Sequence, residues 1–347
     1  MSAPSSATVK PYDTPPTRPL SQVLPLRTPL KVMIDPTNLC NFGCKFCPTG
    51  DHALLKQIKR PKGQMGLDLF QKIINDIKGF PDRLRKIHLY KDGEPLLNRQ
   101  LEQMIVIAKA AGVADSIEFT SNAALLDEVR AQGIIDAGLD AIRISVEHVH
   151  DEGYQAVTQR KVKYDEIVRN VSFLYRQKKV QSSALKIHVK IIDVGLTQAE
   201  KDRFLADFSP ISDSIFINAV MGWTGELDRD WTMGVKADTS IDGYSPIVST
   251  RQVCPDPFKD MVINFNGVVS VCCVDWTMGT AVGDVSTENL VDIWHGKRLR
   301  EFRLTHLRGD RHMLATCRNC NYILGLPKTS DLDCEASSLL KIYQGES

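Results

Sequence analysis

The sequence predicts an α/β protein in which helices cover a parallel sheet, followed by a smaller region rich in cysteine. From Leu30 to Val220, short β-branched runs alternate with amphipathic stretches of helical period. That alternation is typical of parallel strands joined by helices. From Cys254 onward, four cysteines surround a hairpin signal and a helix. With 347 residues, the chain is long enough for one large domain and one small one.

The composition is that of a globular protein without a strong electrostatic bias. Lys and Arg number 43, and Asp and Glu number 42, so no net charge favours nucleic acid or an anionic membrane as a partner. The sequence has no apolar run near the roughly 18 residues of a membrane helix, and its N-terminus lacks the apolar core of a secretion signal. Nine cysteines without an export signal indicate a cytoplasmic protein whose cysteines serve metals or catalysis.

The elements of the first region follow in order. Residues 1–29 hold seven of the seventeen prolines and predict an arm that is extended on the surface or disordered. Apolar runs predict six strands at 30–35, 86–90, 116–120, 141–146, 185–192 and 214–220. Helical periods predict helices at about 66–78, 99–111, 125–137 and 164–177, and a fifth that opens at the capping box of Thr197 and Glu200. Six such units are too few for a closed eight-fold barrel.

The second region begins after a stretch without periodicity. Asn266 and Gly267 separate two apolar runs and predict a hairpin, and a helix over about 290–294 follows. The predicted organisation is therefore an arm, a barrel-like domain, a linker and a cysteine-rich domain with its tail, at 1–29, 30–225, 226–253 and 254–347.

Three cysteines in one loop are the strongest chemical signal. Cys40, Cys44 and Cys47 have the spacing C-x3-C-x2-C, and thiolates this close together can converge on one soft metal centre. Structural zinc sites use four protein ligands, but the next cysteine, Cys254, is more than two hundred residues away. Three ligands suit a 4Fe–4S cubane with one iron left open. Three buried or zinc-bound cysteines are the alternative.

This loop resembles the cluster loop of radical S-adenosylmethionine (SAM) enzymes, which have the same spacing and an aromatic residue before the third cysteine, here Phe46. The resemblance implies a partial (β/α)6 TIM-like barrel. It also implies a 4Fe–4S cluster whose open iron chelates the amino and carboxylate groups of S-adenosylmethionine, with Phe46 among the cofactor-binding residues.

A second motif of this family follows the second predicted strand. Asp92-Gly93-Glu94-Pro95 resembles the family's Gly-Gly-Glu-Pro motif, whose backbone and carboxylate receive the cofactor's ammonium group. Asp92 replaces the first glycine. Ligands of parallel sheets bind at the carboxyl ends of strands, which is where this motif lies.

Other strand ends supply further candidates. Ser121 and Asn122 end the third strand and suit ribose hydroxyls. Ser145 ends the fourth strand, and in related enzymes a serine there and an arginine after the strand, here Arg160, hold the cofactor's carboxylate. Ordinary turn capping is the alternative for Ser121, Asn122 and Ser145.

The four cysteines of the second region form another candidate set, Cys254, Cys272, Cys317 and Cys320. Four thiolates can close a 4Fe–4S cluster or a zinc site, and spacing alone does not separate the two. The run from Gly267 to Cys272 resembles the G-x4-C element of SPASM and twitch domains, which implies an auxiliary 4Fe–4S cluster. Leu326 stands where a full SPASM domain has its next cysteine, which favours a twitch-like form with one auxiliary cluster.

The resemblance also implies the reaction class. The cofactor yields a 5′-deoxyadenosyl radical that takes a hydrogen atom from a small-molecule substrate, after a reductant such as flavodoxin or ferredoxin has supplied an electron. We expect dehydrogenation of an alcohol carbon of a carbohydrate or cyclitol-like molecule. The alternatives are a sugar epimerase and a peptide-modifying enzyme, although 29 proline-rich residues are too few for a leader-peptide domain. A non-catalytic zinc protein is the alternative from another class.

Two residues are candidates for the catalytic step. Cys273 is a hydrogen donor if the enzyme is an epimerase and is otherwise a small buried hydrophobe. Glu147 follows the fourth strand at the edge where a substrate would bind. His88 and Lys190 are expected to be sheet residues with satisfied partners, and Cys334 a surface thiol in the polar tail.

Overall fold

A computed structural model describes residues 7–12, 18–223, 230–241, 243 and 245–345. Its centre is one ten-stranded sheet of order β1-β7-β6-β5-β4-β3-β2-β8-β9-β10. The six predicted strands are all present and pair in parallel, each with its neighbour in the chain. They are β2 (Lys31–Ile34), β3 (Leu84–His88), β4 (Ala114–Ser121), β5 (Ala141–Val146), β6 (Lys186–Asp193) and β7 (Ser214–Ala219).

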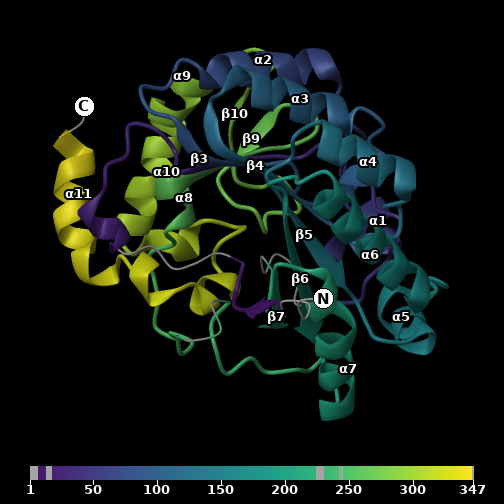
Figure 1. Cartoon of the computed structure of the whole chain (residues 1–347). Coiled ribbons are helices and arrows are strands. Elements are labelled where there is room, and N and C mark those ends of the chain that lie inside the picture. The colour runs from purple at the N-terminus through teal and green to yellow at the C-terminus, as the bar shows by residue number, and fades with distance from the viewer. Residues whose placement is uncertain (1–6, 13–17, 224–229, 242, 244, 346–347) are drawn as a thin grey trace.

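Helices cover the outer face of these strands (Figure 1). The five predicted helices are α2 (Leu67–Ile77), α3 (Leu101–Ala111), α4 (Glu128–Asp136), α6 (Tyr164–Val180) and α7 (Gln198–Phe208). The capping box of Thr197 and Glu200 opens α7 as expected. Two short helices were not predicted, α1 (His52–Gln57) and α5 (Asp151–Thr158). The alternation of helix and strand confirms the partial-barrel fold.

Strand periodicity gives the barrel an apolar outer wall and a polar interior. In β5, Ile142 and Ile144 are fully buried within the main hydrophobic core, whereas Arg143 and Ser145 alternate with them and line a cavity on the other face. The chemistry of the interior is therefore set by every second residue of each strand.

The cysteine-rich region continues the same sheet. β8 (Asp260–Ile263) pairs in parallel with β2, from Lys31 opposite Asp260 to Ile34 opposite Ile263. β9 (Val268–Ser270) returns antiparallel through the predicted hairpin, in which Gly267 has a φ of 92°. β10 (Ala281–Asp284) completes the edge.

Four helices accompany these strands, α8 (Asp256–Lys259), α9 (Leu290–His295), α10 (Lys297–Leu307) and α11 (Ala336–Gly345). Only α9 was predicted. In Figure 1, α9, α10 and α11 lie on the side of the barrel opposite α5 and α6. None of the helices in the described ranges has both the length and the apolarity needed to cross a bilayer.

The N-terminal arm is tied to the barrel. β1 (Thr8–Val9) pairs in parallel with β7 at the sheet edge. The next residues carry Tyr12 into the barrel, where its hydroxyl donates to Glu118 over 2.5 Å and its ring lies 5.1 Å from that of His188. The described part of the arm is therefore packed, while residues 1–6 and 13–17 lie outside the described residues.

Candidate active site

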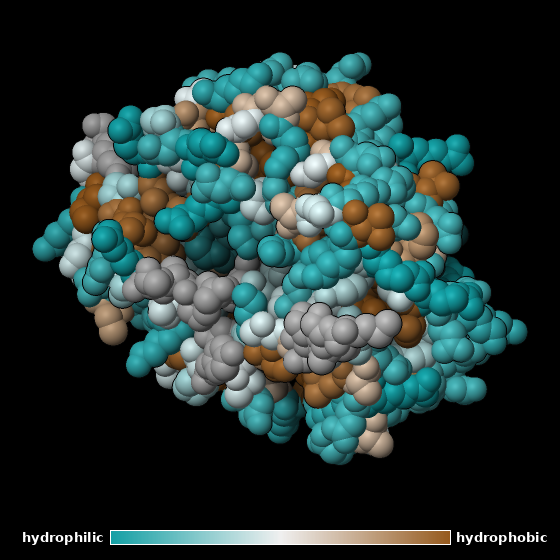
Figure 2. Space-filling model, in the orientation of Figure 1, coloured by the Kyte–Doolittle hydropathy of each residue, from teal (hydrophilic) through white to brown (hydrophobic). Residues whose placement is uncertain are grey.

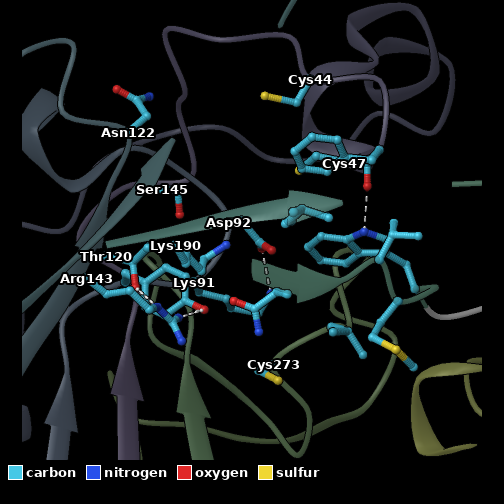
Figure 3. Close-up of a pocket in the computed structure, with 18 of the residues that line it drawn as sticks. Cys44, Cys47, Lys91, Asp92, Thr120, Asn122, Arg143, Ser145, Lys190 and Cys273 are labelled. Carbon is cyan, nitrogen blue, oxygen red and sulfur yellow. Dashed lines mark hydrogen bonds and ion pairs between the residues drawn. The ribbon is translucent and has the colours of Figure 1, made fainter. Parts of the chain in front are cut away.

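A cavity of about 370 Å³ opens at the carboxyl ends of the barrel strands (Figure 3). The face of the molecule seen in Figure 2 is hollowed near its centre, where hydrophilic residues gather. The cavity brings together nearly all residues predicted to bind the first cluster and the cofactor, namely Cys40, Cys44, Phe46, Cys47, Asp92, Gly93, Glu94, Ser121, Asn122 and Ser145. Glu147 and Cys273 also line it.

The cysteine loop folds tightly around its three thiols. The N–H of Cys47 donates to the carbonyl of Cys44 at 3.1 Å, and Gly50 donates to Cys47 at 3.0 Å. A Cβ on Gly50 would lie 2.5 Å from the Cys44 carbonyl, so only glycine fits there. All three thiols are free of disulfides.

The three thiols of this loop are largely withdrawn from water. Burial raises the pKa of the Cys40 thiol to about 12 and raises the pKa of Cys44 and Cys47 as well. Without a cation the three sulfurs stay protonated, and a bound metal would displace their protons. Cys40, Cys44 and Cys47 line one cavity from a single loop, and three thiolates so placed fit a cluster that leaves one iron open.

Glu94 is fixed at the centre of the cofactor motif. Its carboxylate accepts hydrogen bonds from the N–H of Asn122 at 2.7 Å, from the Ser121 hydroxyl at 2.9 Å and from the N–H of Leu96 at 3.1 Å. Burial raises its pKa to about 7, against these hydrogen bonds, which lower it. Gly93 is required because a Cβ there would lie 2.2 Å from the Thr37 carbonyl.

Asp92, which replaces the first glycine of the family motif, has its own buried partners. Its carboxylate pairs with Arg60 at 2.5 Å and with Lys91 at 2.6 Å. Lys91 also donates to the carbonyl of Asp275 at 2.8 Å, which ties the motif to the cysteine-rich region. The carboxylate is thus neutralised by protein cations, and the backbone of the motif can keep its family role.

Ser121 and Asn122 line the cavity and also cap a turn, since Ser121 Oγ accepts from the N–H of Ala123 and Asn122 Oδ1 from that of Ala124, each at 3.0 Å. The Ser121 hydroxyl donates to Glu94, and the Asn122 amide donates to Asn41 Oδ1 at 2.8 Å. Ser145 is therefore the best placed of the three to contact a ribose or a carboxylate.

Arg160 is not where the cofactor prediction requires it. Its side chain is exposed and does not line the cavity. The unpredicted helix α5 fills the chain between β5 and this residue, and Gln159 ends that helix with a φ of 57°. The structure therefore offers no support for Arg160 as the group that holds the cofactor's carboxylate.

Two other titratable side chains face the cavity. Burial raises the pKa of Glu147 to about 7, and burial together with the Arg143 guanidinium lowers the pKa of Lys190 to about 8. The expectation of a satisfied partner holds for His88, whose Nε2 lies 3.4 Å from Glu118, but is wrong for Lys190. Across the described ranges, no hydrogen bond or ion pair reaches the Lys190 ammonium.

Sequence reasoning missed several lining residues. Arg143 of β5 donates to Thr120 Oγ1 at 2.9 Å and to the Tyr90 hydroxyl at 2.7 Å. Tyr12 enters from an arm that carries no motif. The one usable signal was the alternation along β5 and β6, which places Arg143, Ser145 and Lys190 on one face.

The second cysteine set surrounds a smaller cavity of about 20 Å³. Cys254, Cys272, Cys317 and Cys320 all line it, although they come from three separate segments. The Arg311 guanidinium donates to the carbonyls of Cys317 and Cys320 at 2.9 and 3.2 Å and so fixes their loop. Four cysteines that line one cavity fit a cluster closed by protein ligands.

A single side chain stands between the two cavities. Tyr322 lines both, and Cys273 Sγ donates to its hydroxyl at 3.8 Å. Cys272 lines the second cavity and Cys273 the first, just beyond the end of β9 at Ser270. Figure 3 shows Cys273 on the side of the first cavity away from Cys44 and Cys47. Cys334 is exposed, as predicted for a surface thiol.

Known proteins resemble the chain in two parts. Residues 34–196 match the model of the radical SAM superfamily, and residues 254–321 match that of the SPASM iron-sulfur cluster-binding domain. The "tungsten-containing aldehyde ferredoxin oxidoreductase cofactor-modifying protein" of Pyrococcus furiosus is 23% identical over 338 residues, which cover 86% of this chain and 89% of that protein.

Two solved structures share the fold. BtrN in complex with AdoMet and 2-DOIA superposes with a TM-score of 0.54 at 18% identity, covering 84% of this chain and 92% of that one. Streptococcus suis SuiB bound to the precursor peptide SuiA superposes with a TM-score of 0.62 at 12% identity, covering 88% and 74%.

The family matches fall on the segments that hold the two cysteine sets. They establish S-adenosylmethionine, a 4Fe–4S cluster and auxiliary iron–sulfur binding as the cofactor chemistry of the chain, and they decide against a zinc protein. The chain belongs to the radical S-adenosylmethionine superfamily and carries a C-terminal SPASM-type iron–sulfur cluster-binding domain.

Proposed function

We propose that this enzyme dehydrogenates an alcohol carbon of a carbohydrate or cyclitol-like small molecule. The observation that supports the proposal is that Tyr322 lines both the cavity of the cysteine loop and the cavity of the four cysteines. When bound, the cofactors supply a radical that removes one hydrogen atom and an auxiliary centre that accepts one electron. A two-electron oxidation then needs only a residue that takes the hydroxyl proton.

Glu147 is the proposed proton acceptor. Its carboxylate lines the cavity, is 7% exposed and has a pKa raised to about 7 by burial. A base with a pKa near the working pH is well matched to take a proton as it is released. Cys40, Cys44 and Cys47 are the proposed ligands of the first cluster, and Cys254, Cys272, Cys317 and Cys320 those of the auxiliary cluster. A small acidic electron carrier, flavodoxin or ferredoxin, is the proposed reductant.

Epimerisation is the second candidate, because Cys273 lines the same cavity. A thiol there could return a hydrogen atom to the substrate carbon from the face opposite the cysteine loop. The two reactions differ in product mass, since dehydrogenation removes two hydrogens and epimerisation removes none.

The experiment incubates the anaerobically reconstituted enzyme with S-adenosylmethionine, a reductant and a panel of polyols in heavy water. We expect a polyol that stimulates 5′-deoxyadenosine formation to give a product two hydrogens lighter, without solvent deuterium at carbon. Cys273→Ala should leave this conversion largely intact, and Cys334→Ala serves as the matched control because that thiol is exposed.

A product that has lost no hydrogens, but in which one carbon-bound hydrogen is replaced by deuterium, would overturn the proposal. Loss of that product in Cys273→Ala, and not in Cys334→Ala, would assign the chain as an epimerase.

A further inference from the structure

Lys190 presents an ammonium group to the cavity without a protein partner. It lies near the end of β6, directly opposite Ser145 of β5. Within the part of the chain that the structure describes, no carboxylate, carbonyl or hydroxyl comes within hydrogen-bond or ion-pair distance of its Nζ. Lys190 is half-buried, and an ammonium partly withdrawn from water is costly unless it is paired, so such a group usually has a partner.

The neighbouring charges increase this cost. The nearest influences on Lys190 are the Arg143 guanidinium, which repels it, and the Glu147 carboxylate and the Cys44 thiol, which favour its charged form. Glu147 is not at ion-pair distance, so it does not neutralise Lys190 directly. The other cavity lysine, Lys91, differs in that Asp92 and the Asp275 carbonyl satisfy it.

We propose that Lys190 binds an anionic group, a carboxylate or a phosphate, of a ligand held in this cavity. The ammonium lines the cavity, has room for a charged partner and lies next to the Ser145 hydroxyl, which can donate a second hydrogen bond. Figure 3 shows Lys190 and Ser145 on the barrel wall of the cavity, apart from the cysteine loop.

Two ligands could supply the anion. One is the carboxylate of S-adenosylmethionine, for which the expected Arg160 lies outside the cavity. The other is an acid group on the substrate, which would make the substrate a hydroxy acid or a phosphorylated polyol; this source rests on the proposed function. Binding measurements without turnover separate the two, and they do not depend on the outcome of the product analysis.

The experiment compares Lys190→Met with Lys190→Arg and with Lys186→Met. Lys186 lies on the same strand, is exposed and does not line the cavity, so it is the matched control. Each variant is reconstituted anaerobically, and its iron content and thermal midpoint are measured first. Because Lys190 has no protein partner to lose, we expect Lys190→Met to keep both clusters and a midpoint at least as high as that of the wild type.

Calorimetry then measures two affinities. The first is that of S-adenosylmethionine, and the second is that of inorganic phosphate or acetate added to enzyme saturated with S-adenosylmethionine. Loss of one charge-assisted hydrogen bond should weaken the relevant ligand about tenfold or more in Lys190→Met. Lys190→Arg should retain part of the affinity, and Lys186→Met should match the wild type.

A defect confined to S-adenosylmethionine would identify the cofactor carboxylate as the anion. A defect confined to phosphate or acetate would identify an acid group of the substrate. Unchanged affinities for all three ligands, or an equal loss in Lys186→Met, would overturn the proposal.

Discussion

Among single residues, Asp35 carries the least favourable environment. It is fully buried after β2, and neither carboxylate oxygen has a hydrogen-bond partner among the described residues. Burial and the nearby Asp92 carboxylate raise its pKa from 3.8 to about 7, against the opposing effect of Lys91 and Arg60. A carboxyl in this state destabilises the fold once it is ionised.

This predicts how the stability of the cluster-free protein depends on pH. Below about pH 4, Asp35 is protonated in both the folded and the unfolded chain and costs nothing. As the pH rises toward 7, only the unfolded chain gains by ionising, so the free energy of unfolding falls. Asp35→Asn should remove this loss and raise the free energy of unfolding at pH 8 by a few kcal/mol, on the order of the shift in pKa.

Urea unfolding of the two proteins at pH 5 and pH 8 measures the effect. The exposed Asp292→Asn is the control for loss of an acidic charge. A gain in stability at pH 5 as large as that at pH 8 would show that Asp35 is not the titrating group.

The elements of the barrel were predictable because one face of each is apolar. The interior side chains of β5 and β6 follow from the same alternation, as do the two cysteine sets from their spacing. Each element that was not predicted has a physical reason. In α10, Arg303 occupies a core position, where it donates to the Pro257 carbonyl and lies 4.2 Å from the Trp294 ring, so the helical apolar period is broken.

The expectations for two site residues differ from the structure for a similar reason. Arg160 was assigned by resemblance to enzymes that have an arginine after the fourth strand, but here α5 intervenes and Arg160 is exposed. Lys190 was expected to be paired because half-buried sheet lysines usually are. The periodicity of a strand does not tell which of its inward side chains face a cavity rather than a partner. Contacts between distant segments decided both cases.

The loop that carries Cys317 and Cys320 depends on one side chain. Arg311 donates to both of their carbonyls, at 2.9 and 3.2 Å. Arg311→Met should loosen this loop and lower the retention of the auxiliary iron, from about eight irons per chain toward about four. Cofactor cleavage at the first site should persist.

Iron and sulfide analysis after gel filtration, together with 5′-deoxyadenosine formation, measures the effect. Arg318→Met is the control, since Arg318 is an exposed arginine of the same loop. Full iron content in Arg311→Met, or equal loss in both variants, would contradict the assignment.

Across the whole molecule, the barrel and the cysteine-rich region share one sheet. β8 continues β2, and Val32, Ile34 and Ile263 are completely buried along that line. The pair of Lys31 and Asp260, at 3.2 Å, closes the same junction. A boundary at 253 in the chain is therefore not a boundary in the hydrogen-bonded sheet.

Truncation after residue 253 should consequently fail to give an independent barrel. It removes every hydrogen-bond partner of β2 on one side and exposes its apolar residues, which favours aggregation. We expect the fragment to be insoluble or to unfold without a cooperative transition, and the full chain to unfold in one step. Circular dichroism and analytical ultracentrifugation test this; a monomeric fragment with a sharp transition would show that the barrel stands alone.

The position of Tyr12 has a consequence for biosynthesis. This residue is synthesised before its partners: its hydroxyl and ring meet Glu118 and His188, and β1 before it pairs with β7. The β7 partner of Thr8 is Ser214, so the arm stays unpaired until the strands between β1 and β7 have been synthesised. The edge of the barrel sheet thus joins its first strand, β1, to a late one, β7. We expect this pairing to form late in the folding of the nascent chain.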